Sequence, residues 1–445
     1  MTEAFIKNRK KIAVIGAGIS GLSAAWLLHK AHDVTLYERR KRLGGHSHTV
    51  TVSGPGGDIP VDTGFIVYTP SNYPNLTRLF ALLDVPTKNS DMSFAASLDA
   101  GGLEYSGSSV AHMLGQPTNI ARPRFWRMVR GILRFFSTAR VIYDQPDAAC
   151  LSLQDWLERE GYPASFIDDH IMPMGAAIWS CSVAEMRRQP ALAFVRFFDE
   201  HGLLELTERP EWRTVDGGSR EYVKRLAAPI SDRIWHDSAV EAVWRTPNGV
   251  LVRDSQGRTE RYDDVVMASH ADQTQAVIQD LSPSEQAVLG CFRYKPNDVY
   301  LHSDPTLMPL RRRVWSSWNF LGGAGREREG NVTATYWMNK LQGLPDSTPL
   351  FVTLNPVRPP ADHLIHGQYL YDHPIIDLES FAARDRLDDI QGTGGIWYCG
   401  AWTGSGFHED GLRSGLDVAE RIGGVLRPWS QEVTAVQPPL GVAAE

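Results

Sequence analysis

The sequence predicts a mixed α/β protein in which one domain, built around a parallel sheet, is assembled from separate stretches of chain. Three observations lead to this prediction. A short apolar strand near the N-terminus runs into a glycine-rich turn and a helix. Further short apolar strands recur near residues 240–266 and 396–399. The intervening stretches have other patterns, and a chain of 445 residues suits two hydrophobic cores better than one.

Composition excludes several classes of protein. Hydrophobic residues make up 42% and charged residues 22% of the chain, which is typical of a globular protein. The net charge of −7 gives no overall attraction to nucleic acid, so we expect no nucleic-acid partner. The sequence shows neither a signal peptide nor an apolar run of membrane-spanning length. The four cysteines are far apart, without metal or CxxC spacing, and we expect a reduced, cytoplasmic protein with no metal site.

The first strand and helix carry the most specific motif, Gly16-Ala17-Gly18-Ile19-Ser20-Gly21. Gly16 permits a tight turn, Gly18 lets the backbone approach a pyrophosphate, and Gly21 lets the helix lie close to the strand. Ile19 and Ser20 stand at the helix N-terminus, where free N–H groups and the positive end of the helix dipole favour phosphate.

A second apolar strand ends in Glu38, which is placed to accept both ribose hydroxyls of an adenosine. Strand, glycines, helix, second strand and terminal acid in this order predict a dinucleotide site. A basic stretch and a glycine pair follow, and they suit a second approach of backbone to a dinucleotide that continues into a flavin. The residues expected to bind the cofactor here are Arg39, Arg42, Gly44, Gly45 and His46.

This region resembles the RxxGG signature of the amine oxidase, protoporphyrinogen oxidase and phytoene desaturase flavoproteins, in a shortened form, RLGGH. The resemblance implies FAD and an amine oxidase-like fold, that of the Rossmann-like flavoproteins with two dinucleotide-binding domains. It also implies that Val240 contacts adenine through its backbone and that Ser269 ends a strand beside the nucleotide. Gly400, Asp410 and Leu412 lie in a segment that resembles the terminal flavin-binding motif, where a helix N-terminus favours negative charge on the reduced flavin.

These motifs divide the chain. Residues 1–75, 215–275 and 386–428 are expected to form the FAD-binding domain, and residues 429–445 a flexible tail. Residues 76–214 and 276–385 then form an interleaved α+β substrate domain, largely helical in its first stretch and strand-rich in its second. Strands are expected near 299–302, 313–319 and 331–338, where β-branched and aromatic residues concentrate.

The segment 122–140 contains six arginines and no acidic residue. Arg127, Arg130 and Arg134 share one helix face, with aromatic and aliphatic residues around them. Such a helix suits an anionic membrane surface. The alternative is an ordinary domain helix whose apolar side is core and whose arginines are solvated or paired.

Along nearly the whole chain, the segments RLGGHSHTV, PMGAAIWS, WSSWN and GFHEDGLRSG resemble a bacterial group of predicted NAD/FAD-binding proteins in the amine oxidase superfamily. Members of that group accompany cyclopropane-fatty-acid-synthase-like methyltransferases. Some relatives are implicated in desaturating methylated fatty acyl chains, and more distant ones isomerise unsaturated fatty acids. The resemblance implies an acyl-chain substrate in membrane lipid and a lipid methyltransferase as partner. With such a substrate, the segment 122–140 is expected to make peripheral contact with the inner membrane face.

The amine oxidase pattern A-G-E-x-T is altered here to Cys399-Gly400-Ala401-Trp402-Thr403, and Phe407 stands where a tyrosine often walls an amine cage. We therefore expect an apolar substrate that gives up a hydride to the flavin, beside aromatic walls. Phe407, Trp402 and Trp318 are the candidate wall residues. Lys295 precedes a strand and is expected at the surface. Two alternatives stay open: an oxidase of small amines, and a non-catalytic flavin-binding partner of a lipid methyltransferase.

Overall fold

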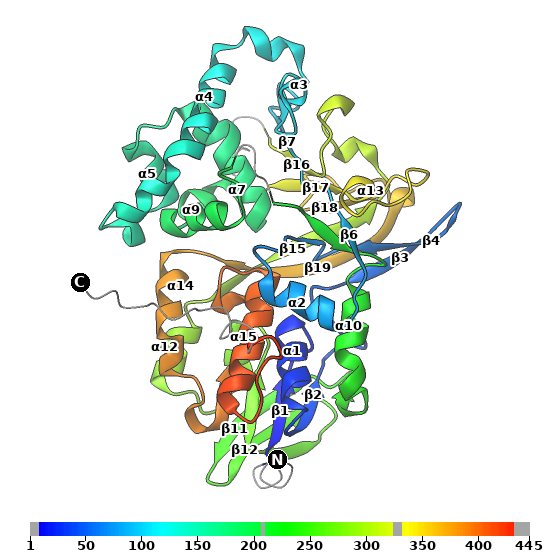
Figure 1. Ribbon diagram of the computed structural model, residues 1–445, viewed down its shortest axis with the longest axis vertical. Helices are drawn as coiled ribbons and strands as arrows, with labels where there is room; N and C mark the ends of the chain where they lie inside the picture. Colours follow the sequence, from blue (N-terminus) through cyan, green and yellow to red (C-terminus); the bar gives the residue numbers. More distant parts are fainter. Residues whose placement is uncertain (1–8, 206–209, 324–331, 431–445) are drawn as a thin grey trace, which may run out of the picture.

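The computed structural model describes residues 9–205, 210–323 and 332–430. The predicted α/β class is confirmed, and the two largest sheets lie in different halves of the molecule. One half contains the parallel sheet, and the other contains a seven-stranded sheet beside a group of helices (Figure 1).

The parallel sheet has the strand order β10-β2-β1-β14-β20. All four pairings are parallel, and Val14 of β1 aligns with Leu36 and Val266 on its two sides. Residues of this sheet are buried on both faces, which explains the continuous apolar runs in the sequence. Its strands are β1 (Lys11–Ile15), β2 (Asp33–Tyr37), β10 (Ile234–Trp235), β14 (Asp264–Met267) and β20 (Ile396–Tyr398).

Helix α1 (Ile19–Leu28) is buried on every side because α10 (Arg220–Ala227) and α15 (His408–Ile422) also pack against it. The small residues at its start let α15 come close: a Cβ on Gly415 would stand 2.1 Å from the Ser20 carbonyl oxygen. The rest of this half comprises β3 (Thr49–Gly54), β4 (Gly57–Asp62), α2 (Pro74–Leu82), β11 (Val240–Thr246), β12 (Gly249–Asp254), β13 (Thr259–Tyr262), α11 (Ala271–Val277), α12 (Pro283–Leu289) and α14 (Leu378–Ala383).

The larger sheet has the order β19-β15-β18-β17-β16-β7-β8. Two of its strands come from the stretch expected to be largely helical, and one of them pairs in parallel with β16. Residues 313 and 314, at the start of a predicted strand, instead lie in a 3-10 turn (Arg312–Val314). The strands are β7 (Phe94–Leu98), β8 (Leu103–Ser106), β15 (Arg293–His302), β16 (Trp318–Leu321), β17 (Thr333–Trp337), β18 (Phe351–Leu354) and β19 (Ile365–Ile375).

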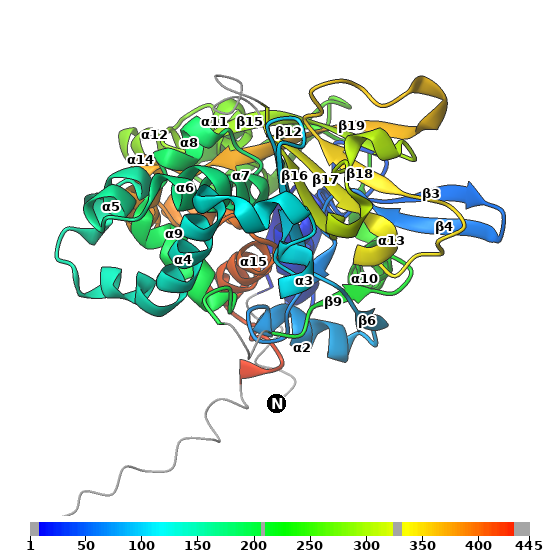
Figure 2. The ribbon, with the colours of Figure 1, turned by 90° about the horizontal axis from the view of Figure 1, so that it is seen from above.

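Helices beside this sheet include α4 (Pro123–Thr138), which confirms the helix predicted within 122–140. Its buried residues recur at helical spacing and join an aromatic-rich core. Figure 2 shows α4, α5, α6 and α9 grouped on one side of β16, β17 and β18. The remaining helices here are α3 (Val110–Met113), α5 (Leu153–Arg159), α6 (Ala164–Phe166), α7 (Met172–Trp179), α8 (Val183–Arg187), α9 (Ala191–Glu200) and α13 (Met338–Leu341).

Ordered packing continues beyond residue 428. The ring of Trp429 stacks on Trp26 with centroids 6.5 Å apart, and its indole N–H donates to the Asn75 amide oxygen at 3.0 Å. Residues 431–445 of the predicted tail lie outside the described residues. Small strands β5 (Val67–Tyr68), β6 (Thr87–Asn89) and β9 (Arg213–Val215) form a sheet between the two halves. In the described part of the chain, no helix has the length and apolar character needed to cross a bilayer.

Candidate functional site

The glycine motif lies where the carboxyl ends of β1 and β14 meet α1. A Cβ on Gly21 would stand only 1.8 Å from the Gly16 carbonyl oxygen, so the helix can begin this close to the turn only with glycine there. A Cβ on Gly16 would lie 3.0 Å from the Ala268 carbonyl oxygen, which places Ser269 next to the turn. Ile19 and Ser20 form the buried first turn of α1.

Two glycine backbones face each other beside this turn. Gly45, with φ of +57°, is positioned so that its Cβ would lie 3.1 Å from the Gly18 Cα. The Gly44 N–H donates to the Ala17 carbonyl oxygen at 2.8 Å, which holds the two loops together. No described atom lies within 4 Å of a Cβ built on Gly18. This backbone-lined space next to a helix N-terminus suits a pyrophosphate.

Glu38 lies at the end of β2, and its carboxylate accepts from the Ala17 N–H at 3.0 Å and the Arg40 N–H at 2.9 Å. The Glu38 carbonyl oxygen accepts from the Ser238 N–H at 2.9 Å. That bond brings the start of β11, with Val240, beside the acid, although about 200 residues of sequence separate them. Arg39 is exposed at the end of the strand.

The C-terminal segment enters from β20. The Gly400 N–H donates to the Ser414 hydroxyl at 3.0 Å, which ties the strand end to α15. The Asp410 carboxylate accepts from the Ser405 and Phe407 N–H groups at 3.0 and 3.1 Å, so it holds the preceding loop. Burial raises the pKa of Asp410. Leu412 is buried in the core, and its carbonyl oxygen accepts from the Ser23 hydroxyl.

A group of imidazole rings lies after the second glycine pair. The His46 ring centroid is 6.0 Å from that of His270 and 5.7 Å from that of His373. Burial lowers the pKa of His46 well below its usual value, and both neighbouring rings add to the effect. Its Nε2 atom is buried with no hydrogen-bond partner among the described residues. The Arg42 guanidinium donates to the Gly45 carbonyl oxygen at 2.8 Å and fixes this loop.

These features fit a flavin dinucleotide. Glu38 would bind the ribose, the Gly16–Gly21 turn and the start of α1 the pyrophosphate, and the Gly44–His46 segment the flavin end. The unsatisfied His46 Nε2 offers a hydrogen-bonding group where the ring system would lie. The N-terminus of the fifteen-residue helix α15 converges on the same region and favours negative charge there.

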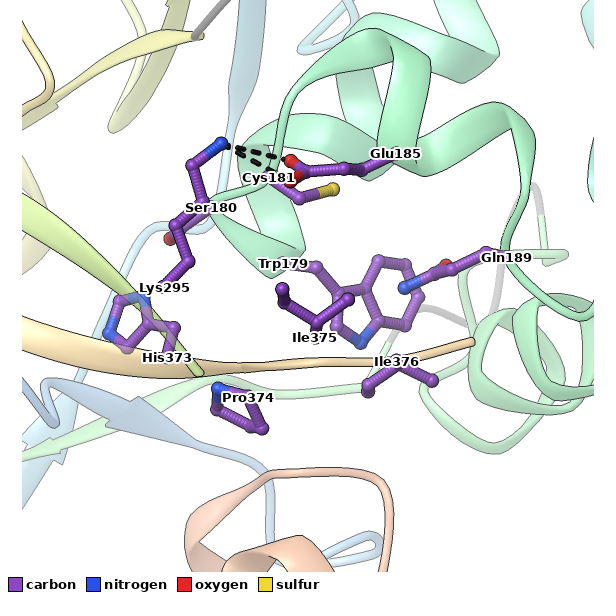
Figure 3. Close-up of a pocket in the computed structure, with 10 residues that line it drawn as sticks. All are labelled: Trp179, Ser180, Cys181, Glu185, Gln189, Lys295, His373, Pro374, Ile375 and Ile376. Atoms are coloured by element: carbon purple, nitrogen blue, oxygen red, sulfur yellow. Dashed lines mark hydrogen bonds and ion pairs between the residues drawn. The ribbon is translucent and has the colours of Figure 1, made fainter. Parts of the chain in front are cut away.

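A small pocket of about 20 Å³ lies between α7, α8 and the ends of β15 and β19 (Figure 3). Four of the residues that line it are apolar, and the other six carry a polar, charged or thiol group. Burial raises the pKa of the Cys181 thiol to about 12 and lowers that of His373 to about 4, so both groups are neutral near pH 7. The lining residues are Trp179, Ser180, Cys181, Glu185, Gln189, Lys295, His373, Pro374, Ile375 and Ile376.

Lys295 lines this pocket, and the prediction of a surface lysine is therefore wrong. Its ammonium lies 3.0 Å from the Glu185 carboxylate, and both side chains are about three-quarters buried. Ser180, which ends α7, has a φ of +53°, a left-handed conformation uncommon for serine. Such backbone is often found at binding sites.

The three candidate wall residues lie in different surroundings. Phe407 stacks on Phe197 with centroids 4.6 Å apart and touches Trp179 of the pocket wall edge-on. Trp318 packs edge-on against Tyr336. Burial raises the pKa of Tyr336, and a hydrogen bond to Ser180 of the pocket lowers it in part.

Trp402 lies elsewhere. It is 3% exposed, packs on Phe292 and donates to the Ser269 carbonyl oxygen at 3.2 Å. The structure therefore places Trp402 in the core of the nucleotide half, and none of the three candidates is among the residues that line this pocket. His373 was missed from sequence, because neither its spacing nor its neighbours mark it.

Comparisons with known proteins agree with this geometry. The model of the flavin containing amine oxidoreductase family matches residues 19–296. A protein of Mycobacterium tuberculosis assigned as a flavin-containing monoamine oxidase, AofH, is 26% identical over 361 residues, covering 79% of this chain and 71% of the relative. The 15-cis-phytoene desaturase of Arabidopsis thaliana is 27% identical over 242 residues, covering 50% of this chain and 40% of the relative.

Solved structures share the fold. A putrescine oxidase variant superposes with a TM-score of 0.67 at 19% identity, covering 93% of this chain and 98% of its own. A fatty acid isomerase from P. acnes that produces CLA gives 0.66 at 15% identity, with the same coverage. The family match spans well over half of the sequence and includes helix α1, Glu38 and the pocket lysine. The chain belongs to the flavin-containing amine oxidoreductase family and is an FAD-dependent oxidoreductase.

Proposed function

We propose that this flavoprotein takes a hydride from an apolar substrate and desaturates or isomerises an unsaturated or methylated acyl chain of a membrane lipid. The observation that carries the proposal is the character of the Figure 3 pocket. Trp179, Pro374, Ile375 and Ile376 provide an apolar wall. Such a wall suits a hydrocarbon segment, whose transfer from water is favourable in proportion to the area buried.

The charges of the pocket support a neutral substrate segment. Among the described residues that line it, Glu185 is the one carboxylate and Lys295 the one ammonium, and they neutralise each other at 3.0 Å. An incoming ammonium or carboxylate would have to separate this partly buried pair, which is costly. A hydrocarbon segment leaves the pair intact.

The bound flavin would supply a two-electron acceptor for the hydride. The chain's own residues then position the acyl chain, exclude water and accept the proton that the substrate loses after the hydride. His373 is neutral near pH 7 and lines the pocket, so its ring can accept a proton from the carbon next to the one that loses hydride. Loss of that proton gives a new double bond, whereas return of the hydride at another carbon gives a shifted one.

Relatives support both outcomes without deciding between them, since a phytoene desaturase matches by sequence and a fatty acid isomerase by fold. A lipid methyltransferase as partner would supply methyl-branched chains. The second candidate is oxidation of a small amine, favoured by the likeness to AofH and to putrescine oxidase. A third is flavin binding without turnover.

The test mixes the purified yellow protein anaerobically with liposomes of monounsaturated or methyl-branched phospholipid while the flavin band is recorded. Bleaching together with a conjugated or additional double bond in the extracted lipid is the result expected of a desaturase. An unchanged flavin spectrum with a relocated double bond is expected of an isomerase. If soluble amines bleach the flavin and lipids do not, the acyl-chain proposal is wrong. If nothing bleaches the flavin and no lipid changes, the protein is a flavin-binding partner.

A further inference from the structure

One face of α4 leaves large apolar side chains in solvent. Trp126 is 40% exposed and Leu133 51%, seven residues apart on the same side of the helix. Ile120 is 58% exposed and lies beside them, because its carbonyl oxygen accepts the Trp126 indole N–H at 2.8 Å. Arg127 and Arg130 are exposed on this side too. We call these five residues the α4 face.

The arginines of the segment 122–140 fall into two groups. Arg124 pairs with Asp169 at 2.6 Å, and Arg140 pairs with Asp199 and Glu205, as the ordinary-helix alternative expects. Arg127 and Arg130 make no ion pair or hydrogen bond with any described residue. Their two charges therefore lie open beside the exposed tryptophan and leucine.

Two more arginines add uncompensated charge at the edge of the face. Arg122 donates to the Gly102 carbonyl oxygen at 2.6 Å. Arg134 donates to the carbonyl oxygens of Glu160 and Gly161 and lies over the Tyr162 ring. Carbonyl partners fix these side chains without neutralising them. The region is thus strongly basic in a protein of net charge −7.

We propose that the α4 face docks on an anionic lipid bilayer, with Trp126, Leu133 and Ile120 in the interfacial layer and Arg127 and Arg130 on lipid phosphates. Exposed apolar groups alone would suit many partners, but their mixture with arginines that lack acidic partners fits a negatively charged interface. The face lies at the end of the molecule remote from the nucleotide sheet (Figure 1), so docking leaves the cofactor site uncovered. The inference depends on this surface alone and holds whatever the substrate is.

The test is co-sedimentation of the flavin-loaded protein with vesicles, without turnover. We expect binding to phosphatidylcholine vesicles containing 30% phosphatidylglycerol, weak binding to phosphatidylcholine alone, and a marked loss of binding at 0.5 M salt. Replacing both arginines (Arg127→Gln with Arg130→Gln) should weaken binding roughly thirtyfold, at about 1 kcal/mol for each arginine near the surface. Trp126→Ala with Leu133→Ala should weaken binding at every salt concentration, because it removes the apolar contribution.

The matched control is Arg253→Gln with Arg261→Gln, which makes the same charge change at exposed arginines of β12 and β13 in the other half of the molecule. This control should bind as the unmodified protein does. Equal loss in both double variants would mean that net charge alone governs binding, and the proposal would be wrong. Absence of vesicle binding by the unmodified protein would also overturn the proposal. A concentration-dependent dimer that Trp126→Ala abolishes would overturn it as well, because a second copy of the chain would then occupy the α4 face. A flavin spectrum and melting temperature like those of the unmodified protein would show that each variant is folded.

Discussion

The Lys295 ammonium and the Glu185 carboxylate lie 3.0 Å apart and join the start of β15 to the start of α8. The same carboxylate accepts the Ser182 N–H at 2.7 Å and so completes the capping box of α8. The Glu185 side chain therefore caps the start of α8 and also neutralises the charge of Lys295. The helical part and the sheet part of the substrate half are held in register at the pocket by this contact.

We expect the pair to contribute about 0.5–1 kcal/mol to the free energy of unfolding, since both groups are partly buried and share hydrogen bonds. A double-mutant cycle with Glu185→Gln and Lys295→Met, measured by urea unfolding, isolates the interaction. The pair Glu221–Lys224 on α10, whose lysine is 64% exposed, is the control, and its coupling energy should be no more than about 0.3 kcal/mol. Equal coupling in the two cycles would mean that the pocket pair has no special role.

Gly45→Ala should reduce flavin affinity at least tenfold, because the added methyl group would stand 3.1 Å from the Gly18 Cα and fill the space expected to hold the cofactor. Fluorescence titration of the apoprotein with FAD measures this loss. Gly257→Ala is the control, since Gly257 also has positive φ, at +76°, but its Cβ would meet no described atom within 4 Å. The control carries a similar backbone strain and should keep normal affinity. Loss of FAD in both variants would point to global destabilisation.

His373→Gln should lower the rate of diene formation by about 10²- to 10³-fold if the imidazole accepts the proton that the substrate loses after the hydride. The FAD content and the vesicle affinity should stay unchanged, which separates this role from cofactor binding and docking. His366→Gln is the control on the same strand, because His366 is exposed and bonds to the Ser303 hydroxyl. A His373→Gln enzyme with full activity would exclude the imidazole as proton acceptor.

His302 should make the stability of the protein depend on pH. Its Nδ1 accepts the Asp304 N–H at 3.0 Å and its Nε2 lies 2.7 Å from the Thr353 hydroxyl, so the neutral ring fits the fully buried site. Burial lowers the pKa of His302 to about 4, below the value of about 6.5 expected for the unfolded chain. The stabilisation is therefore complete above pH 6.5 and is lost as the pH falls toward 4.

When the pH falls from 7 to 5, protonation of His302 in the unfolded chain should lower the free energy of unfolding by about 2 kcal/mol. The pH-dependent loss, measured by urea denaturation, should be smaller by that amount in His302→Asn than in the unmodified protein. His363→Asn, at an exposed position, should leave the pH dependence as it is. An unchanged slope in His302→Asn would mean that the ring is already protonated or free to rearrange.

The nucleotide half could be predicted because its chemistry is local. Gly16, Gly18, Gly21 and Glu38 lie within 23 residues of sequence, and their spacing follows from the distance between a strand end and a helix start. The fold class and the flavin followed from these residues and from the C-terminal motif. Helix α4 was also predictable, since its apolar residues repeat at helical spacing.

The pocket could not be predicted in the same way, because it depends on contacts between distant segments. Lys295 and Glu185 are 110 residues apart, and only the pairing of β15 with β19 brings His373 beside Lys295. Strands β7 and β8 were missed because both are almost entirely buried. Their sequences, FAASL and LEYS, therefore show little of the alternation of apolar and polar residues that marks a half-buried strand. Trp402 was placed by analogy with a binding loop, whereas its indole fills the core behind that loop.

The order of strands in the parallel sheet also constrains how this protein is made. The central strand β1 ends at residue 15, but the edge strand β20 begins only at residue 396. A ribosome adding about 5–20 residues per second has therefore delivered nearly the whole chain before the sheet can close. Until then the apolar edge of β14 has no permanent neighbour, and such unpaired edges invite association between chains. Biosynthesis should thus depend on chaperones that shield this edge, and the flavin should join the protein only after translation has ended.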